Sequence, residues 1–335
     1  MTRPAVLAVD GGNSKADVAL VAADGTLLGA VRGPTISHQA VTIHEAARRF
    51  TALVTAARAG NGGDPGIAVH CLAGADYPSD ISLLTGAFGP IGGASDTLIL
   101  NDTFAALRAG ASRPWGIALI CGQGINAAAV SRDGRRTRFA GVGDIAGDWG
   151  GGTSVGMAGL GAAVRGRDGR GSHTALERTI PRAVGLRRPE AVTHAYYTGR
   201  FDETRVGDLA PVVFATAADG DHVARAIVDR LTDELATMAV ALARRSHLVR
   251  SEPEIVLAGG VFRTDDAGFH ERLAGLIGES IPGARIVRLI IPPVVGAALI
   301  GLDRLAGGAA DAAAEARIRA MLGAWNATPV VVTPS

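Results

Sequence analysis

The stretch AVLAVDGGNSK, residues 5–15, joins five apolar residues to an aspartate, two glycines and a short polar segment. A brief apolar run that stops at glycine is typical of a buried strand ending in a turn. Apolar residues return at 18–22, and Asp-Gly at 24–25 signals a tight turn before the leucines at 27–28. The stretch therefore predicts a β-meander whose first turn is built from glycine.

The same layout returns later in the chain. An apolar run at 116–120 leads into CGQG at 121–124, a second run follows at 127–130, and Asp-Gly at 133–134 supplies another tight turn. A duplicated domain leaves an internal repeat of this kind in a sequence, although glycine-rich hairpins are also common in unrelated proteins. Both interpretations stay open from the sequence alone.

The rest of the pattern alternates strands with helices, which is typical of an α/β fold. A glycine-rich stretch at 141–161 precedes the helical part of the second half. The further elements predicted are a helix at 42–59, strands at 67–72 and 97–100, a short helix at 104–109, a long amphipathic helix at 222–247, strands at 255–258 and 285–291, and a helix at 294–305.

The composition is that of an ordinary globular protein, with 47 % apolar and 19 % charged residues among 335. A chain of this length fits two domains better than one core. The formal net charge of +1 disfavours nucleic acid or an anionic membrane as a partner. We expect a cytoplasmic protein, because the first residues lack a signal-peptide pattern and no apolar stretch approaches the roughly 18 residues of a membrane span.

The two cysteines, Cys71 and Cys121, both fall in apolar runs. Their spacing matches neither a disulfide framework nor a metal or iron–sulfur site. We therefore expect two buried thiols, which fits a reducing compartment.

Three glycine turns each follow an apolar strand, and the third lies after the strand predicted at 255–258. Glycine lets backbone N–H groups face a bound anion. The sequence around these turns matches neither the P-loop motif nor the dinucleotide-binding motif. We therefore expect hairpin-type loops that bind nucleotide phosphates. The predicted ATP- and phosphate-binding residues are Gly11, Gly12, Asn13, Ser14, Lys15, Gly122, Gln123, Gly124, Gly259 and Gly260.

Asp10 and Lys15 carry the charges of the first turn. An aspartate beside bound phosphates suits Mg²⁺, which prefers one or two carboxylates plus phosphate oxygens. Asp10 could equally accept hydrogen bonds from the N–H groups of its own turn. Lys15 is the only lysine among 33 basic residues, and it could neutralise phosphate or remain a solvated surface residue.

In the order of its motifs the chain resembles the sugar kinases of the actin/hexokinase/Hsp70 superfamily. Residues 5–31 resemble their first phosphate motif, 121–126 the second phosphate loop, and 255–262 the adenosine motif. The segment 141–156, which contains GDWGGG, resembles the Gly-Asp-Glu-Gly-Ser segment of N-acetylglucosamine kinases, and 293–299 resembles the closing helix. The sequence is thus identified as a member of the BadF/BadG/BcrA/BcrD ATPase family, in its N-acetylglucosamine-kinase-like branch.

This resemblance implies an α/β fold of two duplicated ribonuclease H-like domains with a nucleotide cleft between them. The N-terminal domain would cover residues 1–110 and be completed by a C-terminal helix at about 303–322. The second domain would cover 111–302, and 323–335 would form a loose tail. The resemblance also implies ATP and Mg²⁺ as cofactors and a homodimer.

The resemblance places the catalytic aspartate at Asp102, after the strand at 97–100. Asp102 would accept the proton of the sugar's primary hydroxyl as a general base, and its position also suits the N-cap of the next helix. In the loop at 37–39, the family's histidine is present but its asparagine is not. The implied sugar-binding residues are His38, Gln39, Asn101, Asn126, Asp144 and Asp148.

Three positions depart from the family pattern. Gln123 stands where a small hydroxyl residue is usual, Asp144 where a histidine is common, and Trp149 where a glutamate is usual. A carboxylate at Asp144 could pair with the ammonium group of a free amino sugar, so we hypothesise a preference for glucosamine over the acetylated sugar. Trp149 could stack on a sugar face or belong to the core.

The predicted function is an ATP-dependent kinase that phosphorylates an amino sugar, N-acetylglucosamine or glucosamine, on its primary hydroxyl. One alternative is a cluster-free ATPase that activates or reactivates a partner enzyme, and another is a sugar sensor without catalysis. The segment around Asp148 resembles one in sugar kinases, which argues against the first alternative. The presence of Asp102 argues against the second.

Overall fold

The computed structural model describes residues 3–325 of the chain. The chain divides into two compact units, each assembled from separated segments. Unit 1 extends to Ala118 and takes in Ala128–Arg136 and the residues from Val287 onward, whereas unit 2 comprises Leu119–Ala127 and Thr137–Ile286. The domain boundaries expected from the sequence stay a prediction.

Unit 1 contains a five-stranded mixed sheet with the strand order β3-β2-β1-β4-β5. The first three strands pair antiparallel as the predicted meander, whereas β4 and β5 run parallel to β1. Because β1, β4 and β5 are parallel, their carboxyl ends share one edge of the sheet. The strands are β1 (Pro4–Gly11), β2 (Lys15–Ala22), β3 (Leu27–Pro34), β4 (Ile67–Leu72) and β5 (Asp96–Asn101).

A second five-stranded sheet has the order β10-β9-β6-β7-β8. Its strands are β6 (Gly116–Cys121), β7 (Ile125–Val130), β8 (Arg136–Arg138), β9 (Glu254–Ala258) and β10 (Arg285–Arg288). Taken from the β8 edge, this order repeats that of unit 1, with β6 in the place of β1 and β9 in the place of β4. The two glycine-rich hairpins are therefore the first hairpins of a duplicated sheet.

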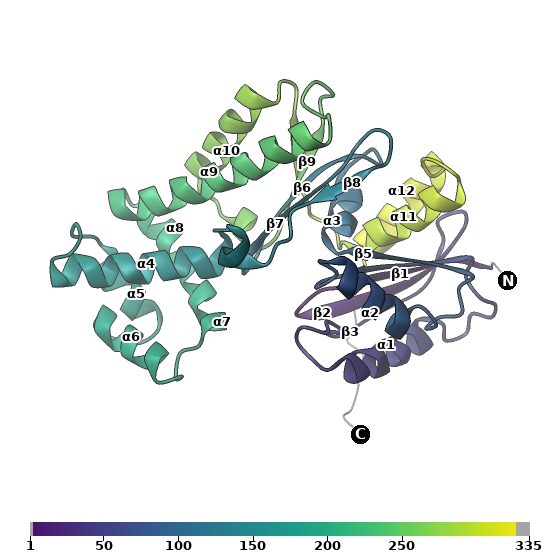
Figure 1. Cartoon of the computed structure of the whole chain (residues 1–335), viewed down its shortest axis with the longest axis horizontal. Helices are drawn as coiled ribbons and strands as arrows, with labels where there is room; N and C mark the ends of the chain where they lie inside the picture. The colour runs from purple at the N-terminus through teal and green to yellow at the C-terminus, as the bar shows by residue number, and fades with distance from the viewer. Residues whose placement is uncertain (1–2, 326–335) are drawn as a thin grey trace. The chain divides into compact units, whose positions relative to one another are not determined.

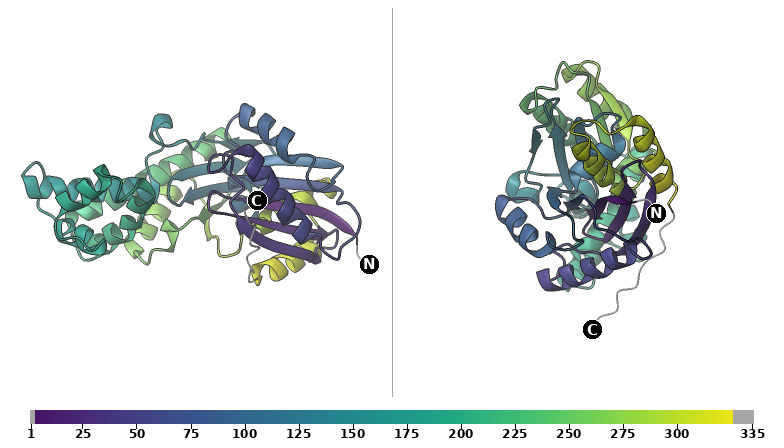
Figure 2. Two further views of the ribbon diagram at one scale, coloured as in Figure 1. Left: turned by 90° about the horizontal axis from the view of Figure 1, so that it is seen from below. Right: turned by 90° about the vertical axis from the view of Figure 1, so that its right-hand side faces the viewer.

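Helices cover both faces of the unit 1 sheet (Figure 1), and Figure 2 shows the same arrangement from two other directions. Successive residues of a strand point to opposite faces. Accordingly, Leu7 and Val9 pack with α1 and α2, whereas Val6 and Ala8 pack with α3, α11 and α12. These helices are α1 (Ile43–Ala57), α2 (Pro78–Phe88), α3 (Thr103–Gly110), α11 (Val294–Leu305) and α12 (Ala312–Gly323).

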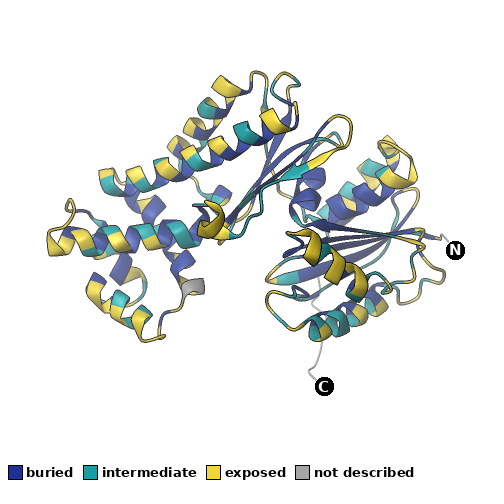
Figure 3. Cartoon of the chain, in the orientation of Figure 1, coloured by how far each residue is buried: buried dark blue, intermediate teal, exposed yellow. Residues whose placement is uncertain are grey.

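The helix α1 shows how the sequence sets these contacts. The side chain of Thr42 precedes the helix and accepts a hydrogen bond from the N–H of Glu45 at 3.3 Å, an N-cap worth about 1 kcal/mol. Apolar residues recur at helical spacing, so one face, including Phe50 and Leu53, is buried while the other is exposed (Figure 3). The helix predicted at 42–59 is confirmed.

Unit 2 consists largely of helices, and the longest of them confirms the amphipathic helix predicted at 222–247. The glycine-rich stretch at 141–161 is helical from Gly151 onward. Across the described residues, no helix combines the length and the apolar composition that crossing a membrane requires. The helices are α4 (Gly151–Asp168), α5 (Leu176–Ala183), α6 (Pro189–Tyr197), α7 (Glu203–Val206), α8 (Ala210–Ala218), α9 (His222–Arg245) and α10 (Ala267–Ser280), with short 3₁₀ turns at Gly143–Ala146, Gly207–Leu209 and Val261–Arg263.

The described C-terminal residues belong to unit 1. After α12, Trp325 packs against the apolar cluster that includes α11 and α12. The guanidinium of Arg32 lies 5.4 Å from the Trp325 ring centroid, within the range of a cation–π contact. Residues 326–335 of the expected tail lie outside the described residues.

Candidate active-site groups

The carboxyl ends of β1, β4 and β5 form the edge that carries the candidate catalytic groups of unit 1. In the parallel register Gly11 lies beside Leu72, and Leu72 lies beside Asn101. Asp10 and Asp102 therefore lie at the same end of two parallel strands that β4 separates. In α/β sheets, this end of the strands is where ligands bind.

Asp10 is the most perturbed carboxyl group at this edge. Its side chain lies opposite Asp17 of β2, and the residue is only 8 % exposed. Burial raises the pKa of Asp10 from 3.8 to about 7, because the charged form loses water. The positive charge of Lys15 lowers this pKa, whereas the negative charges of Asp102 and Asp17 raise it further. Asp10 thus lies in a place where an added cation would favour its ionised form.

The first glycine turn is closed by backbone hydrogen bonds. The N–H of Gly12 donates to the carbonyl of Lys15 at 2.9 Å, and Thr35 Oγ1 donates to the carbonyl of Gly12 at 2.8 Å. Asn13 and Ser14, which the sequence assigns to phosphate binding, are exposed at the tip of this turn. Their exposure leaves them accessible to a ligand.

Lys15 has a partner within the protein. Its Nζ donates to Asp17 Oδ2 at 2.5 Å. The same buried carboxylate accepts two hydrogen bonds from Arg32, at 2.6 and 2.7 Å. Two cations therefore neutralise Asp17, and the phosphate-binding role of Lys15 stays a prediction.

Asn101, which is 3 % exposed, holds the start of α3 beside Asp102. Its Oδ1 accepts hydrogen bonds from the N–H and the Oγ1 of Thr103, at 3.1 and 2.7 Å. Asp102 occupies the N-cap position, but its side chain makes no capping hydrogen bond. The capping bond thus comes from Asn101, and the carboxylate of Asp102 is not used for that purpose.

Asp76 connects two of the predicted sugar-binding residues, although the sequence reasoning did not assign it to the site. Asn101 Nδ2 donates to Asp76 Oδ1 at 3.0 Å, and Gln39 Nε2 donates to Asp76 Oδ2 at 3.3 Å. Asp76 lies in the loop that follows β4, between the strands that carry Asp10 and Asp102. An acidic residue in a glycine-containing loop at that strand end was the available signal.

His38 lies in the same group of loops. A Cβ atom placed on Gly74 would be 2.8 Å from the ring of His38 and 2.9 Å from the side chain of Gln39, so the two loops pack closely. The Nδ1 atom of His38 is buried and has no hydrogen-bond partner among the described residues. One hydrogen-bonding atom of the ring is therefore buried without a partner among the described residues.

In unit 2, the turn at Gly122–Gly124 is fixed by the start of α4. The N–H groups of Gly152 and Thr153 donate to the carbonyls of Gly122 and Gln123, at 2.8 and 3.0 Å. Thr153 Oγ1 also contacts Gln123 Oε1 at 3.3 Å. The first amides of this helix are therefore used to hold the turn, and Gln123 lies against α4 within the protein.

Two glycines are required by these close approaches. Gly151 has φ of +80°, and a Cβ there would lie 2.4 Å from the carbonyl oxygen of Gln123. Gly259, after β9, has φ of +111°, and a Cβ there would lie 2.3 Å from the carbonyl oxygen of Cys121. Any other residue would be strained at both positions. Gly260, next in the chain, is exposed.

The predicted sugar residues of unit 2 differ in their surroundings. Asn126 in β7 packs closely against Gly141, where an added Cβ would lie 2.3 Å from its Nδ2. Asp148 Oδ2 accepts a hydrogen bond from the N–H of Val142 at 3.2 Å. Asp144 lies exposed in the 3₁₀ turn Gly143–Ala146. The segment around Gly141 thus joins Asn126 and Asp148, whereas Asp144 faces solvent.

Trp149 is half-buried and is in contact with an arginine of α9. The guanidinium carbon of Arg230 lies 3.8 Å from the ring centroid of Trp149. This is a close cation–π contact. The Trp149 ring therefore packs against a side chain of the protein itself, a contact that the sequence did not indicate.

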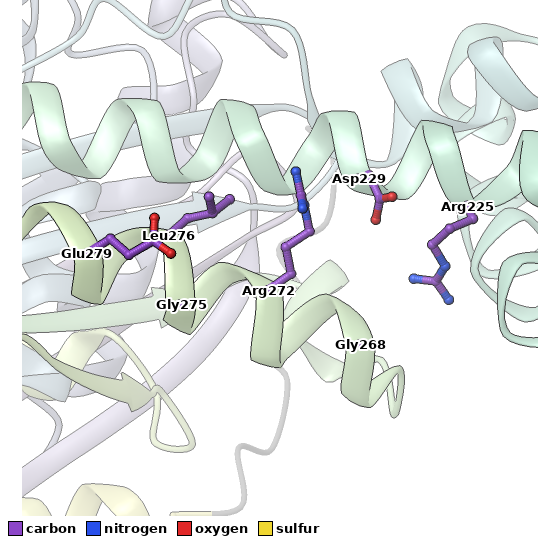
Figure 4. A pocket seen from close by; sticks show the side chains of 7 residues that line it. All are labelled: Arg225, Asp229, Gly268, Arg272, Gly275, Leu276 and Glu279. Carbon is purple, nitrogen blue, oxygen red and sulfur yellow. The ribbon is translucent and has the colours of Figure 1, made fainter.

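A pocket of about 460 Å³ lies on the surface between α9 and α10 (Figure 4). Its two arginines are both paired, Arg225 with Asp266 at 2.9 Å and Arg272 with Asp233 at 2.6 Å. No predicted site residue lines it. We assign it no role in the candidate site. The lining residues are Arg225, Asp229, Gly268, Arg272, Gly275, Leu276 and Glu279.

The two sheets of matching strand order, each with a glycine turn after its first strand, define the two-domain actin-like ATPase fold. Within this class, the chain belongs to the BadF/BadG/BcrA/BcrD ATPase family, whose sequence model matches residues 7–301. The resemblance inferred from the motifs is thus confirmed.

Two characterised relatives cover much of the chain. The N-acetylmuramic acid/N-acetylglucosamine kinase of Clostridium acetobutylicum is 26 % identical over 300 residues, which are 88 % of this chain and 97 % of the relative. The N-acetyl-D-glucosamine kinase of Dictyostelium discoideum is 26 % identical over 209 residues, 61 % of this chain and 65 % of the relative.

Solved structures share the fold. A protein of Chromobacterium violaceum, provisionally assigned as an N-acetylglucosamine kinase, has a TM-score of 0.68 and 22 % identity, over 90 % of this chain and 99 % of its own. A hexokinase of the ROK family from Thermus thermophilus has a TM-score of 0.55 and 20 % identity, over the same shares of the two chains. At these identities the likeness shows the fold alone.

Proposed function

We propose that this protein is an ATP-dependent sugar kinase that phosphorylates an amino sugar on its primary hydroxyl, with Asp102 as the general base. Membership of the ATPase family supports the use of ATP. Both characterised relatives named above are kinases of N-acetylated amino sugars, which supports this class of acceptor.

The observation that carries the proposal is the position of Asp102. It lies at the carboxyl end of β5, beside the strand ends that carry Asp10 and Asp76, and Asn101 performs the capping that Asp102 could have performed. A carboxylate at this edge of the sheet, where ligands bind in α/β proteins, is placed to accept a proton from a bound hydroxyl.

The reaction would proceed by in-line transfer. The sugar hydroxyl oxygen forms a bond to the γ-phosphorus of ATP as the bond from that phosphorus to the β–γ bridging oxygen breaks. The hydroxyl proton moves to Asp102, and ADP leaves with the bridging oxygen. Backbone N–H groups of the glycine turns would stabilise the charge on the phosphates.

Asp10 fits the binding of Mg²⁺, which commonly uses one or two carboxylates together with phosphate oxygens. Its raised pKa, caused first by burial, is the property expected of a carboxylate that needs a cation to remain ionised. Among the described residues no group of three or more acidic, histidine or cysteine side chains could hold a metal alone. We therefore propose that Asp10 would hold Mg²⁺ together with phosphate oxygens of the nucleotide. The metal would neutralise phosphate charge there.

The proposed sugar-binding side chains are amides, an imidazole and carboxylates. In unit 1, Asn101, His38 and Gln39 are brought together through Asp76 and Gly74, as described above. In unit 2, Asn126 and Asp148 are the proposed partners. Asp144 would pair with an ammonium group at C2, and on this ground we propose that glucosamine is accepted in preference to the acetylated sugar.

A coupled assay of ADP release tests the proposal directly. N-acetylglucosamine, glucosamine, N-acetylmuramic acid, glucose and a sugar-free control would be compared, each with ATP and Mg²⁺. We expect ADP release to require an amino sugar. Asp102→Asn should lower kcat by about 10²- to 10⁴-fold, the usual contribution of a general base.

Asp96→Asn, at the other end of β5, is the matched control and should retain activity, because Asp96 is exposed and far along the strand from Asp102. Sugar-independent ADP release would favour the partner-activating ATPase. Sugar binding without ADP release would favour the sensor. Near-normal turnover by folded Asp102→Asn protein would refute the assigned base.

A further inference from the structure

Unit 1 contains a second cavity that none of the proposed catalytic or substrate-binding residues lines. Its volume is about 930 Å³, within the range of small-molecule sites. It lies beside α3, the hairpin turn at 131–136 and the end of α11. Arg304 in its wall pairs with Asp96, which begins β5, so this wall lies toward the end of the strand opposite Asp102.

The cavity is strongly basic for a protein with a net charge of +1. Five arginines and two aspartates line it, which gives three more positive than negative charges. Two of the arginines are neutralised: Arg108 pairs with Asp303 at 2.7 Å, and Arg304 with Asp96 at 3.1 Å. The other three arginines therefore carry the positive excess, reduced by Asp133, the remaining carboxylate of the lining.

Those three arginines are Arg113, Arg132 and Arg136. None of them forms a hydrogen bond or ion pair with another residue in the part of the chain that the structure describes. Aromatic rings hold them instead: Arg113 and Arg132 lie 4.8 and 5.8 Å from the Trp115 centroid, and Arg136 lies 5.9 Å from that of Phe104. Stacking on rings leaves the N–H donors of a guanidinium available.

Like charges meet in this cavity as well. The pKa of Arg136 is lowered from its usual value, first by desolvation and also by the positive charge of Arg304. An anion bound between the arginines would remove this repulsion. Planar guanidinium groups recognise phosphate through paired hydrogen bonds, which ammonium groups cannot make.

We propose that this cavity binds a phosphate-bearing small molecule, through Arg113, Arg132 and Arg136. The proposal is independent of the kinase assignment. The cavity has room for more than one phosphate group or for a phosphate with a sugar ring, so pyrophosphate and a hexose 6-phosphate should bind more tightly than inorganic phosphate.

The test uses Trp115 as a local probe. Wild-type protein and Trp115→Phe would be titrated with inorganic phosphate, pyrophosphate, glucose 6-phosphate and, as a neutral control, glucose. The part of the tryptophan fluorescence response that is missing in Trp115→Phe reports this cavity and excludes phosphate bound at the glycine turns. The three anions distinguish free phosphate, a polyphosphate and a sugar phosphate as ligands.

Arg132→Gln/Arg136→Gln should weaken the Trp115-dependent binding by about tenfold or more, since two charge-assisted hydrogen-bond donors to the anion are lost. Arg182→Gln/Arg187→Gln removes the same charge from an exposed part of unit 2 and should leave binding unchanged. Asp102→Asn should also leave it unchanged. A missing response to all three anions up to about 10 mM, or equal affinity in the Arg132/Arg136 variant, would overturn the proposal.

Discussion

The strand ends of unit 1 and the glycine-rich segment of unit 2 hold their candidate residues in different ways. In unit 1, ionisable and amide side chains are buried and bonded to one another, as Asn101 is to Asp76. In unit 2, backbone contacts between the Gly122–Gly124 turn and the start of α4 provide the order, and Asp144 is exposed. The groups proposed for chemistry are thus fixed by a sheet, whereas the sugar-binding residues proposed in unit 2 depend on glycine contacts.

The largest effect is expected at Asp10, where unit 1 buries a charge. Asp10→Asn should lower kcat/KM by at least about a hundredfold, because a group that stabilises phosphate charge is lost. It should also raise the free energy of unfolding at pH 8. The pKa of about 7 exceeds the value of 3.8 for a solvated carboxyl, so the carboxyl weakens the fold as the pH rises from about 4 to 7.

Steady-state kinetics and denaturant unfolding at pH 8 check both effects, with Asp96→Asn as the control for losing one carboxylate. In the wild-type protein, kcat/KM should fall as the pH drops below about 7, because Asp10 becomes protonated. An Asp10→Asn protein that is active, or one that is less stable at pH 8, would contradict this assignment.

The glycine contacts of unit 2 can be broken at Gly151. Gly151→Ala combines a positive φ with a 2.4 Å approach to Gln123, so we expect a loss of about 2–4 kcal/mol in the free energy of unfolding. Gly161→Ala, in the same helix but with open space around it, should instead stabilise by about 0.5–1 kcal/mol. Thermal and denaturant unfolding of both variants measure this. Equal effects would show that the close approach does not hold the turn.

The sheet of unit 1 also buries a histidine. His70 in β4 is fully buried, neither ring nitrogen has a hydrogen-bond partner among the described residues, and burial lowers its pKa to about 3. The unfolded chain binds a proton at His70 below about pH 6.5, while the folded protein does not. Stability is thus lost as the pH falls from 6.5 toward 3, by about 2 kcal/mol between pH 7 and 5.

His70→Leu should remove this loss, so the free energy of unfolding should vary less between pH 7 and 5 than in the wild-type protein. His44→Leu, on the exposed side of α1, provides the matched control and should retain the wild-type dependence. If His70→Leu and wild-type protein lose stability in parallel, the buried imidazole is not the cause.

The smallest effect is expected at Asp144, because an exposed ion pair contributes only about 0.2–1 kcal/mol. Asp144→Asn should lower the ratio of kcat/KM for glucosamine to that for N-acetylglucosamine by up to about fivefold. Asp168→Asn, exposed at the end of α4, should leave the ratio unchanged. A wild-type enzyme that strongly prefers the acetylated sugar would remove the basis for this proposal.

Elements with strong periodicity were predictable from the sequence. The strand at 67–72 and the helix at 294–305 have the predicted bounds, because buried apolar runs and flanking glycine or proline define both ends. The helix α2 was not predicted, since only Leu84 and Phe88 of its residues are buried and its apolar pattern is weak. Local pattern is informative where one face of an element is clearly buried.

The site residues that follow predicted strands could be found from the sequence. The contacts between residues far apart in the chain could not. Asp10 and Asp102 follow apolar runs, and the parallel order of their strands places them on one edge. The bonds of Asp76 to Asn101 and Gln39, and the arginine on Trp149, join residues far apart in the chain. The helix that starts at Gly151 was hidden by a composition typical of loops, and its glycines are explained by close approaches to Gln123, Val206 and Val213.

The packing of α11 and α12 on the sheet of unit 1 bears on how the protein is made. The ribosome releases β1–β5 first, but α3 covers only part of one apolar face, and the rest is covered by α11 and α12 from the last fifth of the polypeptide. Most of unit 2, by contrast, is one continuous segment that can form earlier. During synthesis one face of the first sheet is therefore only partly covered until α11 and α12 emerge, and this interval is when the nascent protein is most exposed to aggregation.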